Sequence, residues 1–437
     1  MNVKRKNLVQ KIVSAGLALS LCLGLLPATA LAAPRAASVQ DAHDCAAAAS
    51  VASLLELQNV LGGGGEDILL SPAEDDAVWS VTSALSVPAG RTVHIRVAEG
   101  KRVTLKRGGS AGGINLFQVA AGGTLILGDG QVSYNGASLT EAAQKGDYTV
   151  IDKFSGSLIL DGGAVWTKGS AYTPGDSVGD NIVMYDDDGG QYRYTNSGVT
   201  ATAALIQSSG TLDIWNGVKL QNNVLRNGAN SYGSAIQSLS GSTLDLFGGE
   251  ISHCVTAALG DDNNNDTGRG AVFIGSFVTS NWNAKPAITN SHFNMYGGVI
   301  TNNAIVGNKQ DGGGVSVETA YMDLYGGEIS YNHGGLSATG GVTGDGGGLM
   351  VRNNAQFTMW GGSVDHNFAG GYGGGIVAWN ATVNIKGGSI TQNKASYGGG
   401  VAIASSNDGN ENVTAQVAMD GGIISHNLHI CKWKGTL

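Results

Sequence analysis

The phrase Leu244-Asp-Leu-Phe-Gly-Gly-Glu-Ile-Ser-His-Cys254 decides the fold, because it returns along the chain. Close copies run from Phe293 to Asn303, Met322 to Asn332, Phe357 to Asn367, Val383 to Asn393 and Val417 to Asn427. The shared pattern is apolar-x-apolar-x-Gly-Gly-x-(Ile/Val)-x-x-Asn, with looser copies from Leu125, Leu158 and Leu212. Repetition of this kind is typical of solenoids, in which each unit buries its apolar face only against its neighbours.

A second phrase precedes four of the copies, at Gly312 to Val317, Gly346 to Val351, Gly373 to Ala378 and Gly398 to Ile403. Apolar residues recur at every second position in both phrases, which is the signature of β-strands. Three short strands per repeat that close on themselves and stack describe a parallel β-helix. The pattern therefore predicts an all-β fold with inward apolar columns, in which Val315, Met322 and Leu324 take part.

The glycines and asparagines of the repeat have structural roles in this fold. Sharp turns between strands often need a positive φ, which only glycine adopts without steric cost. The asparagine that ends each copy is predicted to turn inward and to form an amide ladder from rung to rung. The ladder members are Asn223, Asn303, Asn332, Asn367, Asn393 and Asn427, and Cys254 takes their place in one repeat as a buried, non-catalytic residue.

The N-terminus has the features of an export signal. Basic residues including Lys4 and Lys11 precede the apolar run Ile12 to Leu26, and Ala30 and Ala32 supply small residues before a cleavage site. We predict cleavage after Ala32 and a secreted or cell-surface location. No later segment approaches 18 uninterrupted apolar residues, so no transmembrane segment is expected in the mature chain.

The remaining chain divides by its pattern. After the signal peptide (1–32) comes a cap region (33–89), in which Val51 to Leu61 has the leucine spacing of a short capping helix. The β-helix repeats follow (90–427). The irregular tail (428–437) shows no further rung, and we interpret it as an unusual cap or as a sign that the chain is part of a longer protein.

Composition narrows the function. The chain has 70 glycines, 42% hydrophobic and only 14% charged residues, which argues against disorder. The net charge of −9 becomes more negative once the basic leader is removed, so nucleic acid is excluded as the expected partner. Three scattered cysteines outside the leader do not form a disulfide framework.

The Gly-Gly-Gly-Val and Gly-Gly-x-Ile-x-x-Asn phrases, with the export signal, resemble the right-handed parallel β-helix proteins of the pectin-lyase-like superfamily. Within it the chain is most similar to adhesin-like bacterial surface proteins, and more distantly to chlamydial polymorphic membrane proteins. The resemblance covers roughly residues 90 to 427 and implies the fold. The superfamily includes lyases, hydrolases and non-enzymatic adhesins on one scaffold, so it leaves the function open.

One outward position of the repeat is aromatic on five successive rungs. If Leu244 and Leu246 point inward, the same phase turns five aromatic residues outward: Trp215, Phe247, Tyr296, Tyr325 and Trp360. Polar residues flank them, Asp323 among them. Such a stripe either stabilises the outer strand faces and packs under loops, or binds carbohydrate, since sugar rings stack on aromatic faces while their hydroxyls need polar partners.

Two further clusters are weaker candidates. Asp213 and Asp245 stack in phase, so they are the carboxylates of the enzyme alternative, a retaining glycosidase pair, although outward Asp residues on such rungs are ordinarily solvated. Asp262, Asn264 and Asp266 imitate the start of a calcium loop. Thr267 replaces the glycine that loop requires and Phe273 replaces its bidentate glutamate, so a solvated polar loop is favoured over a Ca²⁺ site, and no cofactor is expected.

We conclude from the sequence that this is an exported, non-enzymatic, adhesin-like β-helix. Its expected partners are a polysaccharide, or a glycan or protein of a host or cell surface. A polysaccharide lyase or glycoside hydrolase on the same fold is the alternative, and a passive structural stalk is the third interpretation.

Overall fold

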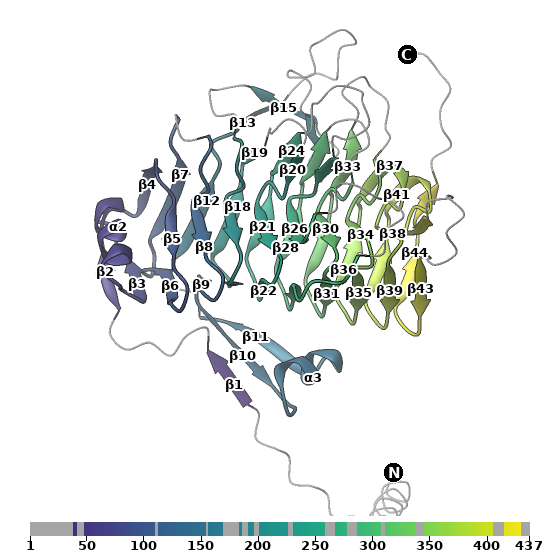
Figure 1. The fold of residues 1–437 in the computed structure, drawn as a ribbon, viewed down its shortest axis with the longest axis horizontal. Helices are drawn as coiled ribbons and strands as arrows, with labels where there is room; N and C mark the ends of the chain where they lie inside the picture. The colour runs from purple at the N-terminus through teal and green to yellow at the C-terminus, as the bar shows by residue number, and fades with distance from the viewer. Residues whose placement is uncertain are drawn as a thin grey trace, which may run out of the picture. The chain divides into compact units, whose positions relative to one another are not determined.

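The computed structural model shows a parallel β-helix, as predicted (Figure 1). It describes residues 38–41, 48–109, 112–153, 156–168, 183–185, 191–195, 201–225, 230–257, 267–277, 286–306, 311–336, 344–404 and 415–429. The predicted signal segment and residues 430–437 lie outside these ranges. No helix within the described ranges is long and apolar enough to cross a membrane.

Strands of successive rungs pair in parallel and in register, and build four long sheets in the described chain, numbered here in the order in which a rung visits them. Sheet 1 contains β5 (Leu85–Val87), β8 (Phe117–Val119), β16 (Ile206–Ser208), β21 (Ile236–Leu239), β26 (Val272–Gly275), β30 (Val315–Glu318), β34 (Leu349–Arg352), β38 (Ile376–Trp379) and β42 (Val401–Ala404). Sheet 2 contains β2 (Ala49–Val51), β3 (Asp67–Leu70), β6 (Thr92–Val97), β9 (Thr124–Leu127), β17 (Thr211–Ile214), β22 (Thr243–Leu246), β27 (His292–Met295), β31 (Tyr321–Leu324), β35 (Gln356–Met359), β39 (Thr382–Ile385) and β43 (Gln416–Met419).

The other two sheets complete each rung. Sheet 3 contains β4 (Asp76–Val81), β7 (Arg102–Arg107), β12 (Ser157–Asp161), β18 (Val218–Gln221), β23 (Glu250–Ser252), β28 (Val299–Thr301), β32 (Glu328–Ser330), β36 (Ser363–Asp365), β40 (Ser389–Thr391) and β44 (Ile423–Ser425). Sheet 4 contains β19 (Val224–Leu225), β24 (Val255–Ala257), β29 (Ala304–Val306), β33 (His333–Leu336), β37 (Phe368–Tyr372), β41 (Lys394–Tyr397) and β45 (Leu428–His429).

Sheet 4 corrects the expectation of three strands per repeat. Its short strands follow the ladder asparagines, so the rung that starts at β34 continues through β35 and β36 into β37 before the next rung begins. The sequence concealed this fourth strand because its members are only two to five residues long, and some, such as His-Gly-Gly-Leu in β33, have no apolar alternation. Their strand conformation is imposed by pairing with the neighbouring rungs.

The core lies inside the coil and follows the predicted phase. Val315, Val317, Met322, Leu324 and Ile329 are buried, and Met322 lies in register between Phe293 and Phe357. Burial of each such side chain contributes about 1.5–3 kcal/mol, but only while adjacent rungs cover it.

The turn between sheets 2 and 3 uses the second glycine of each Gly-Gly pair. Its φ is positive in the six close copies, at Gly249, Gly298, Gly327, Gly362, Gly388 and Gly422. The turn between sheets 3 and 4 is also left-handed, yet it uses other residues: Asn222, His253, Asn302, Tyr331, His366, Gln392 and His426, with φ between 52° and 57°. Each of these residues directly precedes a ladder position.

The predicted amide ladder is present inside this second turn. The side-chain Nδ2 of Asn303 donates to Oδ1 of Asn332 at 3.0 Å, and the same bond joins Asn332 to Asn367, Asn367 to Asn393 and Asn393 to Asn427. Cys254 interrupts the ladder, and burial raises the pKa of its thiol to about 12, so the thiol stays protonated. Beyond the interruption, the buried guanidinium of Arg107 donates to Asn223 Oδ1.

A helix lies at the N-terminal end of the described coil, close to the predicted Val51 to Leu61. This is α2 (Leu54–Gly62), which buries Leu57 and Leu61. Ser53 caps it by accepting a hydrogen bond from the Glu56 backbone, while the Glu56 carboxylate accepts one from Ala52. Residues 33–89 thus contain α2 together with strands β2 to β5 of the coil.

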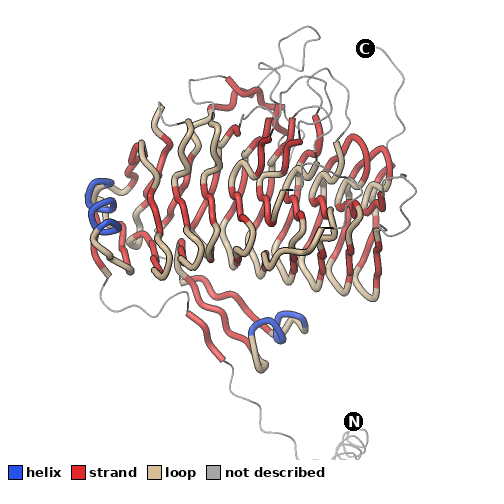
Figure 2. The backbone as a smooth tube through the Cα atoms, viewed as in Figure 1, coloured by secondary structure: helices blue, strands red, loops and turns tan. Residues whose placement is uncertain are grey.

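Segments outside the four long sheets add further strands and the second helix (Figure 2). An antiparallel pair, β10 (Gly130–Tyr134) and β11 (Tyr148–Asp152), carries α3 (Leu139–Gln144) between its strands. A second addition contains β13 (Val165–Lys168) and β14 (Val183–Tyr185), which both pair antiparallel with β15 (Gln191–Thr195). The strands β20 (Asn230–Tyr232) and β25 (Thr267–Arg269) form a parallel pair. The remaining strand is β1 (Ser38–Asp41).

Candidate functional site

The five predicted aromatic residues form one row at the end of sheet 2, called the aromatic row below, and four of them stack on one another. Trp215 and Phe247 stack with ring centroids 4.0 Å apart, Phe247 and Tyr296 are 4.9 Å apart, and Tyr296 and Tyr325 are 5.0 Å apart. The interplanar angles are 6° to 12°. Trp360 packs against the same cluster.

The expectation that this row is exposed is wrong for four of its five members. Trp215, Phe247, Tyr296 and Tyr325 are between 1% and 7% exposed, and only Trp360 is half-buried. The reason is the insertion formed by β10, α3 and β11, called the cover below. Its residues Val132, Leu139 and Ala143 are buried in the same apolar cluster as the rings.

Specific contacts hold the cover on the aromatic row. The Tyr148 hydroxyl donates to the backbone carbonyl of Tyr296 at 2.6 Å, and the two rings meet edge to face. Thr140 of α3 hydrogen bonds with the Tyr296 side chain. Gly130 lies so close to Trp215 that an added Cβ would be 2.3 Å from the indole ring. The row therefore packs under an insertion, which is the structural alternative that the sequence left open.

A row of outward polar residues runs beside the rings on the same strands. Asp213 and Asp245 are in-register neighbours, as predicted, and Asn294 and Asp323 continue the row. Asn294 donates to Asp245 Oδ1 at 2.8 Å, whereas Asp213 Oδ1 is buried and accepts no hydrogen bond from the described residues. The two neighbouring carboxyls thus share a single hydrogen-bond donor, Asn294, which bonds Asp245 alone. This arrangement favours a proton on the pair, because it reduces the repulsion between the two charges.

The protonation of this pair follows from its burial. Desolvation, together with the Asp245 charge, raises the pKa of Asp213 well above its usual range. Desolvation raises the pKa of Asp245 to about 6, although the hydrogen bond from Asn294 opposes the shift. Because the two groups are coupled, the pair rather than either residue takes up the proton, and it is not the solvated pair that outward positions ordinarily provide.

Asp323 has a different environment at the far end of the row. It accepts a hydrogen bond from the Trp360 indole Nε1 at 2.8 Å, and burial raises the pKa of its carboxyl. Trp215 has no corresponding acceptor on the preceding rung, where Ile126 pairs with Asp213, and its Nε1 is buried without a partner among the described residues. The Trp360 end is thus the polar, half-open end of the aromatic row.

The candidate calcium ligands Asp262, Asn264 and Asp266 lie outside the described residues. Within the described ranges, no three His, Cys, Asp or Glu side chains are grouped as a metal site would require.

A second column was missed by the sequence analysis. It contains the residue before each Gly-rich turn that leads into sheet 1, and is called the pre-glycine column below: Tyr232, Arg269, Asp311, Asp345, Tyr372 and Tyr397. Backbone pairing joins Tyr232 to Arg269, Arg269 to Asp311, Asp311 to Asp345, and Tyr372 to Tyr397. The signal was present in the sequence, since all six residues directly precede a glycine, and four of these glycines, at 312, 346, 373 and 398, start the second phrase.

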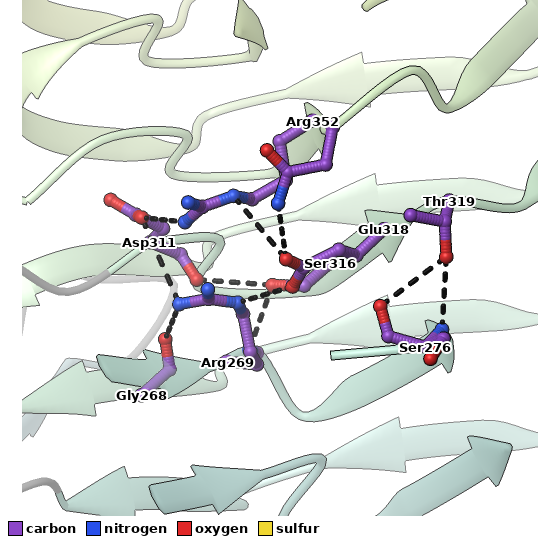
Figure 3. A network of polar contacts seen from close by, with 10 residues as sticks. Gly268, Arg269, Ser276, Asp311, Ser316, Glu318, Thr319 and Arg352 are labelled. Atoms are coloured by element: carbon purple, nitrogen blue, oxygen red, sulfur yellow. Dashed lines mark hydrogen bonds and ion pairs between the residues drawn. The ribbon is translucent and has the colours of Figure 1, made fainter. Parts of the chain in front are cut away.

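The middle of this column belongs to a buried ionic network (Figure 3). Arg269 Nε lies 3.0 Å from Glu318 Oε2, and Arg352 Nη1 lies 2.7 Å from Asp311 Oδ2. Each arginine also reaches the other carboxylate at 3.8 Å. All four side chains are at most 10% exposed, and the two arginines hold the pKa of Glu318 below its usual range against the effect of burial.

Asp345 extends the network by one rung. Its Oδ1 accepts the Tyr372 backbone N–H at 2.7 Å. Burial and the neighbouring Asp311 charge raise the pKa of Asp345 to about 7. Two arginines thus face two firmly placed carboxylates, and the third carboxyl is about half protonated at neutral pH.

Comparisons with protein-family models, with curated proteins and with solved structures gave no match.

Proposed function

We propose that this chain is an exported, non-enzymatic, adhesin-like member of the pectin-lyase-like superfamily that binds carbohydrate on a host or cell surface. The observation that carries the proposal is the half-open end of the aromatic row. Four residues define it and are called the Trp360 platform: Asp323, Thr358, Trp360 and Asn384.

The Trp360 platform combines a fixed ring with polar neighbours. Asp323, Thr358 and Asn384 are in register on β31, β35 and β39, and all three side chains are half-buried. The bond from Trp360 Nε1 to Asp323 fixes the indole before a ligand arrives, which lowers the entropic cost of binding. A pyranose stacks its apolar face on such a ring and directs its hydroxyls to amide and hydroxyl groups.

The test is affinity electrophoresis of the purified protein in gels that contain xylan, pectin, laminarin or hyaluronan. We expect at least one polysaccharide to retard the protein, Trp360→Ala to remove the retardation, and Trp360→Phe to retain most of it. Trp379→Ala is the matched control, because Trp379 is a half-buried tryptophan on sheet 1. Normal mobility of the wild-type protein in every gel would refute carbohydrate binding.

The enzyme alternative is supported by one observation, the raised pKa of Asp213 and Asp245 in an in-register pair. A glycoside hydrolase needs one carboxyl protonated and the other ionised. Release of reducing ends from any of the four polysaccharides, lost in Asp245→Asn, would establish this alternative in place of the binding function.

A further inference from the structure

The C-terminal part of the pre-glycine column differs in exposure from the part inside the ionic network. Arg269 and Asp311 are 0% and 7% exposed, whereas Tyr372 and Tyr397 are 38% and 46% exposed. Among the large apolar side chains that are exposed in the described part of the chain, these two tyrosines are the aromatic ones. Exposed rings on a rigid scaffold are the feature that the covered aromatic row lacks.

The two rings are fixed relative to one another. Tyr372 and Tyr397 are register partners in sheet 4, and the backbone N–H of Gly373 donates to the Tyr397 carbonyl at 2.9 Å. The ring centroids are 4.9 Å apart at an interplanar angle of 24°. Since paired strands hold both residues, a ligand would find the rings already in place.

A carboxyl group lies at the foot of this ring pair. Asp345 Oδ1 accepts the Tyr372 N–H, and an added Cβ on Gly371 would be 2.1 Å from that oxygen, so the glycine permits the approach. Among the described residues, no donor is directed at Oδ2 of Asp345. An acceptor carboxyl is thus held directly beside the Tyr372 backbone.

The charges around Asp345 favour a neutral ligand over a cation. The positive groups of Arg269 and Arg352 are matched by Asp311 and Glu318, and Arg352 also acts on Asp345. No strong negative potential remains to attract a cation to the tyrosine faces. A neutral ring with hydroxyl groups has the apolar face and the hydrogen-bonding edge that two tyrosines and one carboxyl can use.

We propose that Tyr372, Tyr397 and Asp345 form a saccharide-binding site, separate in residues and sheet from the Trp360 platform. The ligand class, carbohydrate, is the same as in the proposed function, and this assignment rests on that function. Its rings provide stacking surface and phenolic hydroxyls, and Asp345 provides an acceptor for sugar hydroxyls.

The experiment places Tyr372→Ala, Tyr397→Ala and Asp345→Asn beside Trp360→Ala in the same polysaccharide gels, with dissociation constants from the dependence of mobility on polysaccharide concentration. We expect each tyrosine variant to weaken binding by about tenfold, the loss of one stacking contact. Tyr372→Phe should keep most of the affinity, because it retains the ring. Melting curves verify folding, which the two tyrosine substitutions should leave unchanged because both side chains are exposed.

The outcomes separate the two proposals. Retardation that is lost in Trp360→Ala but unchanged in all three column variants would overturn this site and leave the proposed function standing. Retardation that is lost in the tyrosine variants alone would establish this site and remove the Trp360 platform as the contact. If no polysaccharide retards the wild-type protein, both proposals fail.

Discussion

Replacing Asn367 by Ala tests how much the amide ladder contributes to the fold. The Asn367 side chain makes four hydrogen bonds: Nδ2 donates to the Ile329 carbonyl at 2.8 Å and to Asn393 Oδ1 at 3.0 Å, and Oδ1 accepts from Asn332 N at 2.9 Å and Asn332 Nδ2 at 3.0 Å. The site is fully buried, so water cannot replace these partners.

The magnitude follows from the groups that lose their partner. Asn393 Oδ1 keeps the Asn367 backbone N–H, and Asn332 Nδ2 keeps the Ile300 carbonyl. The Asn332 N–H loses its acceptor, whereas Ile329 lies in β32, whose backbone stays paired with β36. A buried polar group left unpaired costs about 1–3 kcal/mol, so we expect Asn367→Ala to lower the free energy of unfolding by about 1–3 kcal/mol.

Equilibrium urea unfolding followed by circular dichroism measures this change. Asn384→Ala is the matched control, because Asn384 lies on the outer face of sheet 2 and should change stability by less than about 0.5 kcal/mol. Native-state hydrogen exchange adds a local readout, since the Asn332 N–H should lose protection. A loss below about 1 kcal/mol, with Asn332 still protected, would refute the ladder as a main source of stability.

Three further changes test other features. Asp245 has a pKa of about 6 when folded and about 3.9 when unfolded, so the folded state binds more protons between these values and stability falls as pH rises through 6. Asp245→Asn removes the share of this residue in the loss and the Asp245 charge that raises the pKa of Asp213, so urea unfolding at pH 8 should show a variant that is about 2–3 kcal/mol more stable, with a weaker pH dependence; an unchanged pH profile would contradict the assigned shift. Glu318→Gln leaves two buried arginines undercompensated and should destabilise by about 3–5 kcal/mol, while wild-type stability would show that the network is dispensable. Gly130→Val should force the cover away from Trp215 and increase the quenching of tryptophan fluorescence by iodide, because the Trp215 ring becomes accessible. Unchanged quenching would show that the cover adjusts without opening.

The repeat made most of the coil predictable. Alternation in phrases such as Met322 to Leu324 gives the inward phase directly, and the terminal asparagines place the ladder because an inward polar side chain needs a partner on the next rung. The aromatic stacking followed from the same phase. These features depend on local periodicity and on contacts between adjacent rungs, and the sequence of each repeat determines both.

The cover and the ionic network were not predictable in the same way. Residues 130–152 break the repeat, and nothing in their local pattern says which face of the coil they will bury, so Trp215 could not be recognised as covered. Asp311 lies before β30 and Glu318 is the last residue of β30, and their partners Arg269 and Arg352 belong to the rungs on either side. Such a network depends on the folding of loops around it, which sequence periodicity does not describe.

The asparagine ladder also has a direction. In every link from Asn303 to Asn427, the earlier rung supplies both donors, the backbone N–H and the side-chain Nδ2, and the later rung supplies the accepting Oδ1. The amide dipoles therefore point the same way along the axis and polarise one another, with their oxygen ends toward the N-terminal rungs. At Asn223, on the other side of Cys254, the oxygen end meets the cationic Arg107. Each rung from Asn303 to Asn393 has two donors that the next rung satisfies, so a further rung can continue the ladder only if it presents an amide oxygen toward the N-terminal side.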